Sequence, residues 1–153
     1  MNGNLPAPGG VGIHRALMRN TGFLLSRMGT VAQKRFSERL DSIGLTLRMW
    51  GALNVLDADG AITQHTLGQR TGVDPSTVVA TIDELEARGL VQRRPHPTDR
   101  RAHALHVTAL GAQTLADGRD LATREQRDLL APLSVQEREQ LHSLLLRLVL
   151  ATT

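Results

Sequence analysis

Residues 72–111 hold an order of local signals that few folds can accommodate. Asp74 followed by Pro75 is typical of a helix start, because the aspartate accepts from free backbone N–H groups and proline has no N–H to leave unpaired. An apolar stripe at helical spacing follows, made of Val78, Ile82 and Leu85. Gly89 can adopt the positive φ that ends a helix, so we expect one helix between Asp74 and Gly89.

Two extended runs and an arginine-rich turn follow this helix. The first run begins at Leu90 and stops at the prolines of positions 95 and 97, and residues 102–107 return with the alternation of a strand. The turn between them contains Thr98, Asp99, Arg100 and Arg101. We therefore expect a two-stranded hairpin with arginines at its tip, to which Ala61 and Ile62 add a short third strand.

A shorter helix is expected just upstream, from a cap at Thr63 through Thr71, with Gly72 beginning the turn to the next helix. The two helices should pack crosswise, and Gly68 falls on the inner side, where a small residue lets the backbones approach. A helix-turn-helix followed by a hairpin is a winged helix-turn-helix. The second helix of such a unit enters the major groove of double-stranded DNA, so the sequence indicates a DNA-binding function.

Several short motifs carry a family resemblance across residues 44–111. They are Leu45, Thr46 and Trp50 before the helix-turn-helix, GVDPST at 72–77, LEARGLV at 85–91, DRR at 99–101, and the return over 105–111. As a set, these motifs resemble the MarR family of bacterial transcription regulators. The resemblance implies a mainly α protein with a small β wing, acting as a homodimeric repressor that a small, often aromatic, acid releases from DNA.

The wing tip holds the first group of candidate DNA contacts. We expect Arg101 to enter the minor groove, where the negative potential is enhanced when the groove is narrow, and Arg100 to meet phosphate. The resemblance implies that Asp99 holds Arg101 in position, and Thr98 belongs to the same tip. Arg93 and Arg94 face opposite ways on one strand, so only one can face DNA. Arg94 is included as a candidate, and the sequence leaves the choice open.

The helix-turn-helix holds the second group of candidate DNA contacts. Three hydroxyl residues lie in the half of the recognition helix that reaches base edges: Ser76, Thr77 and Thr81. The alternative is that they act only as helix caps. Three residues at the start of the preceding helix are expected to touch the DNA backbone: Gln64, His65 and Thr66.

Composition limits the remaining possibilities. A chain of 153 residues suits one domain, and 2% aromatic residues leave its core to aliphatic side chains, which favours helices. The net charge is only +3, yet residues 91–108 carry four arginines against one aspartate. The sequence has no cysteine, which excludes disulfides, thiolate metal sites and thiol-based sensing. Without a signal peptide or an apolar run of ~20 residues, we expect a cytoplasmic protein with no membrane partner.

The flanking segments divide the chain into three parts. We expect a loose arm over residues 1–10, the winged helix-turn-helix over 44–108, and a helical dimerisation region formed by 11–43 and 109–153. A long helix should run from Ile13 to Leu40. The last helix has too many apolar residues for one face, namely Leu141, Leu144, Leu145, Leu146, Leu148, Val149 and Leu150. Such a helix is either a core helix or a dimer interface, and a two-fold pair that reads a palindromic operator favours the interface.

The effector prediction rests on the family resemblance. An aromatic acid needs an apolar slot and a cation, and the candidate residues are Arg15, Arg19, Phe23 and Trp50. A solvated helix face is the alternative interpretation of this set. The six histidines are scattered over different elements, which argues against a metal-responsive regulator, and we expect no cofactor. No enzyme motif is present, so the competing function is a winged helix that docks on protein.

Overall fold

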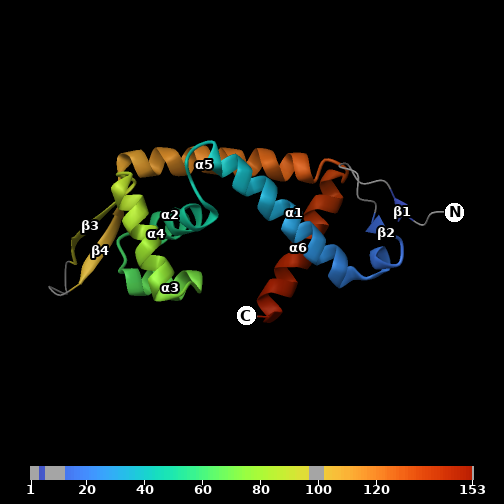
Figure 1. Ribbon diagram of the computed structural model, residues 1–153, viewed down its shortest axis with the longest axis horizontal. Coiled ribbons are helices and arrows are strands. Elements are labelled where there is room, and N and C mark those ends of the chain that lie inside the picture. Colours follow the sequence, from blue (N-terminus) through green and yellow to red (C-terminus); the bar gives the residue numbers. More distant parts are fainter. Residues whose placement is uncertain (1–3, 6–12, 97–101, 153) are drawn as a thin grey trace.

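Helices make up most of the chain in the computed structural model, which describes residues 4–5, 13–96 and 102–152 (Figure 1). The elements in chain order are β1 (Asn4–Leu5), β2 (Ile13–His14), the 3-10 helix η1 (Leu17–Arg19), α1 (Thr21–Asp41), α2 (Leu47–Asp59), α3 (Gln64–Thr71), α4 (Pro75–Ala87), β3 (Val91–Pro95), β4 (His103–Val107), α5 (Ala109–Leu129) and α6 (Val135–Thr152). The mainly α fold with a small β wing is confirmed.

Figure 1 shows α5 as a long helix that connects two regions of the protein. The winged unit, made of α2, α3, α4, β3 and β4, lies at the start of α5, and α1 and α6 lie toward its end. None of the helices in the described part of the chain is long and apolar enough to cross a membrane.

Four side-chain caps set the starts of α2, α3, α4 and α5, and those at Thr63 and Asp74 are predicted from the sequence. The capping residues are Thr46, Thr63, Asp74 and Thr108. Each side chain accepts from the backbone N–H three residues further on, at 3.2, 3.1, 3.0 and 3.0 Å respectively. Local capping chemistry therefore places the helices of the winged unit where the sequence predicts them.

The first long helix begins later than predicted. It starts at Thr21, because Asn20 has an extended backbone and its side chain accepts from the Phe23 N–H at 3.0 Å. The prediction of a helix from Ile13 is therefore wrong for residues 13–20. Ile13–His14 instead pair antiparallel with Asn4–Leu5, so these two residues of the expected loose arm form a strand.

The core lies inside the winged unit. The predicted stripe of α4 packs inward, with Val78, Ile82 and Leu85 all buried. Leu53 of α2 and Leu105 of β4 are fully buried with them, and Leu40 of α1 and Leu115 of α5 join the same cluster. The long helices are thereby packed onto the winged unit at one end.

The wing is a two-stranded antiparallel sheet that pairs Val91 with Val107 and Pro95 with His103. The predicted third strand is reduced to one bridge, in which the Leu105 N–H donates to the Ile62 carbonyl at 2.8 Å. This bridge joins the segment between α2 and α3 to β4.

Glycine fixes the junction between the wing and α5. A Cβ added to Gly111 would lie 2.0 Å from the Leu90 carbonyl oxygen, so no larger residue fits there without movement. The neighbouring Thr108 hydroxyl donates to the Gly89 carbonyl at 2.7 Å, and Gly89 has the predicted positive φ of 70°. The long helix is therefore held tightly against the start of the wing.

Candidate nucleic-acid interface

The helix-turn-helix corner depends on a close approach of α3 to the start of α4. A Cβ added to Gly68 would lie 3.3 Å from the Val73 carbonyl oxygen and 3.5 Å from a methyl of Val78. Gly72 turns the chain with a φ of 65°. The predicted packing role of Gly68 agrees with this geometry.

The start of α4 is organised by one carboxylate. Asp74 accepts from the Ser76 hydroxyl at 2.5 Å and from the Thr77 N–H at 3.0 Å. The Ser76 hydrogen bond, followed by those from Thr77, holds the pKa of Asp74 well below its ordinary value. Ser76 and Thr77 therefore take part in the cap, and Ser76 is also exposed on the outer side of the helix.

Thr81 is a correction to the predicted DNA contacts. Its side chain is buried, at 8% exposure, and its hydroxyl donates to the Thr77 carbonyl at 2.7 Å. The physical reason is its position three residues after Val78, which turns it toward the core side of α4. Its hydroxyl is therefore not available to a base.

The three candidates at the start of α3 differ in availability. His65 is exposed. The Thr66 hydroxyl is hydrogen bonded to the Thr63 hydroxyl at 3.0 Å, within the cap of the helix. Gln64 is half-buried, and its amide nitrogen has no acceptor among the residues that the structure describes. His65 is the member of this group that faces solvent most freely.

The wing strand β3 separates the two arginines that the sequence could not distinguish. Arg93 pairs with Asp83 at 2.5 Å and also with Glu86, and its side chain is only 23% exposed. Arg94 faces the other way and is exposed. Arg94 is therefore the arginine of this strand that remains available to an external partner.

The remaining wing candidates lie outside the described residues. Thr98, Asp99, Arg100 and Arg101 all belong to residues 97–101, between the end of β3 and the start of β4.

The four predicted effector residues are not brought together within one chain. Arg15 is exposed just before η1, and Arg19 is exposed as the last residue of η1. Trp50 packs edge-on against Phe36, with ring centroids 5.0 Å apart. Phe23 lies thirteen residues before Phe36 on α1, which amounts to about 20 Å along the helix.

Trp50 has a packing role between α2 and α5. A Cβ added to Gly118 would lie 2.9 Å from Cδ1 of Trp50, so the absence of a side chain at Gly118 lets the indole approach α5. Its N–H has no hydrogen-bond partner among the described residues. The ring therefore connects three helices, α1, α2 and α5.

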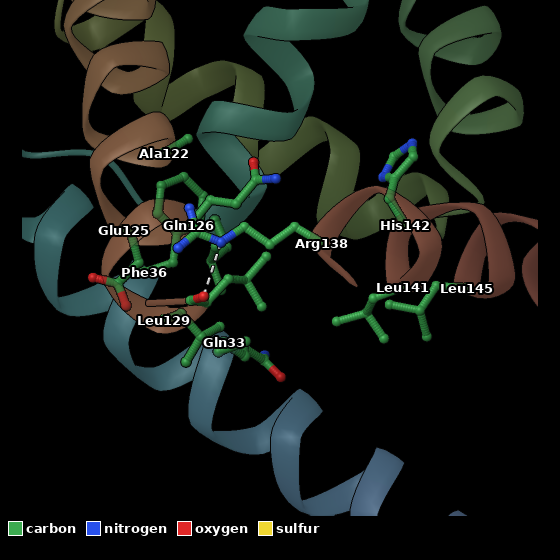
Figure 2. A pocket seen from close by; sticks show the side chains of 13 residues that line it. Gln33, Phe36, Ala122, Glu125, Gln126, Leu129, Arg138, Leu141, His142 and Leu145 are labelled. Atoms are coloured by element: carbon green, nitrogen blue, oxygen red, sulfur yellow. Dashed lines mark hydrogen bonds between the residues drawn. The ribbon is translucent and has the colours of Figure 1, made fainter. Parts of the chain in front are cut away.

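A different cavity, of about 470 Å³, lies between α1, α5 and α6. Its walls include Phe36, Leu129 and Leu141, and its polar lining includes Arg138 and Gln126. Figure 2 shows Arg138 reaching from α6 toward Gln126 of α5. Arg138 Nε donates to the carbonyls of Leu130 and Leu133 at 3.0 and 2.9 Å, which orients the guanidinium group.

A buried carboxylate also lines this cavity. Glu125 of α5 is 4% exposed and pairs with Arg35 at 2.5 Å and Arg39 at 2.7 Å, both from α1. Arg39 also pairs with Asp128 at 2.8 Å. Glu125 therefore ties α1 to α5, and its charge is compensated by these two arginines. Arg138 of α6 lines the same cavity.

Sequence comparison decides the family. The model of the MarR family matches residues 43–102. A protein of Thauera aromatica assigned to transcriptional regulation of the hcr operon is 34% identical over 137 residues, which cover 89% of this chain and 82% of that protein. The chain belongs to the MarR family.

Solved structures similar to this MarR-family chain share its fold. A protein of Pseudomonas aeruginosa assigned as a transcriptional regulator is 35% identical, with a TM-score of 0.76 and coverage of 86% of this chain and 98% of that one. The transcriptional repressor CouR, bound to a 23-mer DNA duplex, is 32% identical, with a TM-score of 0.79 and coverage of 88% and 96%. The chain is a transcriptional regulator with the winged-helix fold of the MarR family.

Two exposed residues on α4 of this MarR-family chain were not among the predicted contacts. Val79 is 44% exposed, and Ala80 beside it is exposed as well. The sequence carried a signal for both, because they fall outside the buried stripe of Val78, Ile82 and Leu85. Neither residue carries a hydroxyl group, the feature that marks the predicted contacts on this helix.

Proposed function

We propose that this MarR-family regulator is a homodimeric repressor that binds a palindromic operator in double-stranded DNA and is released by a small aromatic acid. The observation that carries the DNA-binding part is the exposed outer face of α4, which lies beside the paired strands β3 and β4, and the sequence between these strands contains Arg100 and Arg101. An α-helix of this kind enters the major groove, and basic residues neutralise phosphates.

The proposed DNA contacts divide by groove. Ser76 and Thr77 at the start of α4 face base edges in the major groove, and Arg101 of the wing enters the minor groove. Arg94 and Arg100 meet phosphate, as does His65 at the start of α3. The winged unit, residues 44–108, is the DNA-binding part of the chain.

Dimerisation is proposed from the exposed apolar surface of α6. Over its described length, Val135–Thr152, this helix has no buried residue. Its exposed apolar side chains are Val135, Leu144, Leu145, Leu146, Leu148, Val149 and Leu150. A surface this apolar is typical of an interface.

A second copy of the chain is the occupant that we propose for this surface. Leu24, Leu25 and Met28 of α1 are also exposed, and a groove of about 800 Å³ runs between α1 and α6. Residues 11–43 and 109–153 then form the dimerisation region. A two-fold pair presents two copies of α4 about one turn of DNA apart, which is why the operator is proposed to be palindromic.

The effector is proposed to bind in the cavity between α1, α5 and α6. Phe36 and the leucines supply apolar walls, and Arg138 supplies a cation whose two Nη nitrogens have no acceptor among the described residues. A carboxylate can accept two parallel hydrogen bonds from such a guanidinium group. The acid can release the dimer from DNA only if it binds more tightly to a conformation in which the spacing of the two α4 helices does not match the operator than to the conformation that binds DNA.

The DNA-binding proposal is tested by fluorescence anisotropy with a duplex enriched from a random pool, titrated at several salt concentrations. We expect affinity to fall steeply as salt rises, because arginine contacts release counterions from phosphate. Light scattering on the same sample should give two chains free and two chains per duplex. If no sequence is enriched and the affinity for DNA does not depend on salt, the DNA-binding proposal is contradicted and the alternative, a winged helix that docks on protein, is favoured.

The effector proposal is tested with benzoate and 4-hydroxybenzoate. Both acids should raise the melting temperature of the protein and weaken operator binding, and Arg138→Gln should remove both effects while leaving DNA affinity without acid unchanged. Arg15→Gln and Arg19→Gln serve as the matched comparison. Loss of both effects in these variants, but not in Arg138→Gln, would place the effector at the N-terminal set that the sequence predicted.

A further inference from the structure

The outer face of α4 presents methyl groups at positions where polar groups are expected to read DNA. Ser76, Val79, Ala80 and Asp83 recur at spacings of three, four and seven residues, so they share the face opposite the buried stripe. All four residues are exposed, and Val79 is 44% exposed.

The polar members of this face are engaged within the protein. The Ser76 hydroxyl donates to the Asp74 carboxylate at 2.5 Å, and Asp83 pairs with Arg93 at 2.5 Å. Ser76 can still accept a hydrogen bond, whereas Val79 and Ala80 offer only methyl groups. The outer face of α4 therefore presents an apolar contact surface between the Ser76 hydroxyl and the Asp83 carboxylate, both of which already bond to other groups of the protein.

Val79 lies at the rim of a groove between α3 and the start of α4. Helix α3 lines this groove with Gln64, His65 and Gln69, while Val73, Pro75 and Val78 line it from the turn and from α4. The rim therefore offers the methyl groups of Val79 next to polar side chains of α3, which suits a partner that carries a methyl group among polar groups.

We propose that Val79, with Ala80 beside it, reads the C5-methyl group of a thymine in each operator half-site. This inference rests on the proposed function, since it requires α4 to enter the major groove. The N-terminal half of a recognition helix reaches base edges, and Val79 follows the cap residue Asp74 by only five positions. The thymine methyl is the apolar feature that base pairs present in that groove.

The test replaces each thymine of the selected operator, one at a time, with deoxyuridine. This change removes the C5-methyl group and keeps every hydrogen-bonding group of the base. Each half-site should contain one thymine at which this replacement weakens binding. We expect the replacement in one half-site to weaken binding roughly fourfold, the factor for burial of one methyl group, and the replacement in both half-sites to weaken it about sixteenfold.

The Val79→Ala variant identifies the side chain responsible. Because it lacks the γ-methyl groups, it should bind the thymine and deoxyuridine operators equally at that position. Arg48→Ala is the control, because Arg48 is exposed on α2 and belongs neither to the proposed DNA contacts nor to the proposed dimer interface, and this variant should keep the full deoxyuridine effect.

Two results would overturn the inference. In the first, the unmodified protein binds equally well when deoxyuridine replaces any of the thymines. In the second, deoxyuridine weakens binding of Val79→Ala by the same factor as binding of the unmodified protein. Either result, obtained with an operator that the protein selects and binds in a salt-dependent way, leaves the proposed function standing. Failure to select any DNA sequence would overturn the proposed function itself, and this inference with it.

Discussion

Arg93 and Glu86 join the wing to the recognition helix through two different groups of the arginine. The Arg93 backbone N–H donates to one carboxylate oxygen of Glu86 at 3.0 Å, and its guanidinium group bonds the other oxygen. The same guanidinium group reaches Asp83. The first residues of β3 are thereby held against the second half of α4, so the wing and the helix keep a fixed relative position.

This contact predicts opposite roles for neighbouring arginines. Arg93→Ala should lower the free energy of unfolding by about 1 kcal/mol, since it breaks a partly buried ion-pair network and leaves two carboxylates without their partner. Arg94→Ala should leave stability unchanged and weaken DNA binding at all sequences, with a salt slope reduced by about one. Urea unfolding and anisotropy titrations on both variants check the assignment. Equal effects of the two variants on both measurements would contradict it.

The junction between α5 and the wing predicts a large effect of one added methyl group. Gly111→Ala places a Cβ where the Leu90 carbonyl oxygen lies, so the helix or the strand must shift, at a cost of about 1–3 kcal/mol.

Gly51→Ala is the matched control for this substitution. Gly51 is also a helix residue, but its added Cβ would meet no atom of the described residues within 4 Å. That variant should gain up to about 1 kcal/mol from helix propensity. In thermal unfolding, we expect the melting temperature to fall for Gly111→Ala and to rise for Gly51→Ala, each relative to the parent protein. A Gly111→Ala protein as stable as its parent would contradict the described junction.

Acid should weaken the link between wing and helix. The Arg93 N–H, and then its guanidinium group, lower the pKa of Glu86 from an ordinary value of 4.5. A carboxylate whose folded pKa is depressed stabilises the protein above the ordinary value, and this contribution is lost as pH falls through the folded pKa. The difference in unfolding free energy between the parent and Glu86→Gln should be constant from about pH 7 to 5 and shrink below about pH 4.5.

Denaturant titrations over this pH range measure that difference. Glu139→Gln removes an exposed carboxylate of α6 and serves as the control for loss of one charge. A parent-to-variant difference for Glu86→Gln that persists unchanged in acid would show that the ion pair contributes nothing to stability.

The wing tip predicts two distinguishable arginine contacts. Arg101→Ala should weaken specific DNA binding by on the order of 1–3 kcal/mol, because it removes a minor-groove contact that depends on local groove width. Arg100→Ala should weaken binding evenly across sequences and lower the salt slope by about one. Anisotropy at fixed salt, on selected and random duplexes, separates the two effects. Unchanged binding by Arg101→Ala would remove the wing from the mechanism.

Local chemistry explains why much of the winged unit is predictable from sequence. Thr63, Asp74 and Thr108 each cap a helix through a bond to a backbone N–H three residues away, so a short window contains all the necessary information. The stripe of α4 likewise follows from helical spacing. The late start of α1 was missed because apolar residues continue upstream of Asn20, whose capping bond outweighs that periodicity.

Tertiary contacts account for what the sequence did not predict at the site. In the sequence, Thr81 cannot be distinguished from the other hydroxyl residues of the recognition helix, and its burial is seen only once the helix packs on the core. Arg93 and Arg94 are the same residue type on one strand, and only the positions of Asp83 and Glu86 beside β3 distinguish them. Arg138 follows the turn after α5 and faces the cavity only because α6 folds back beside α1. No spacing rule predicts such a contact.

The most direct test of the central claim is the selection of duplexes bound by the full chain from a random pool, followed by sequencing of the enriched DNA. A two-fold pair of winged units predicts an inverted repeat whose half-site centres lie about 10 base pairs, or one helical turn, apart. Enrichment of such a repeat would support DNA reading and dimer geometry together. A pool that stays random, or that yields one asymmetric site bound by a single chain, would contradict the account.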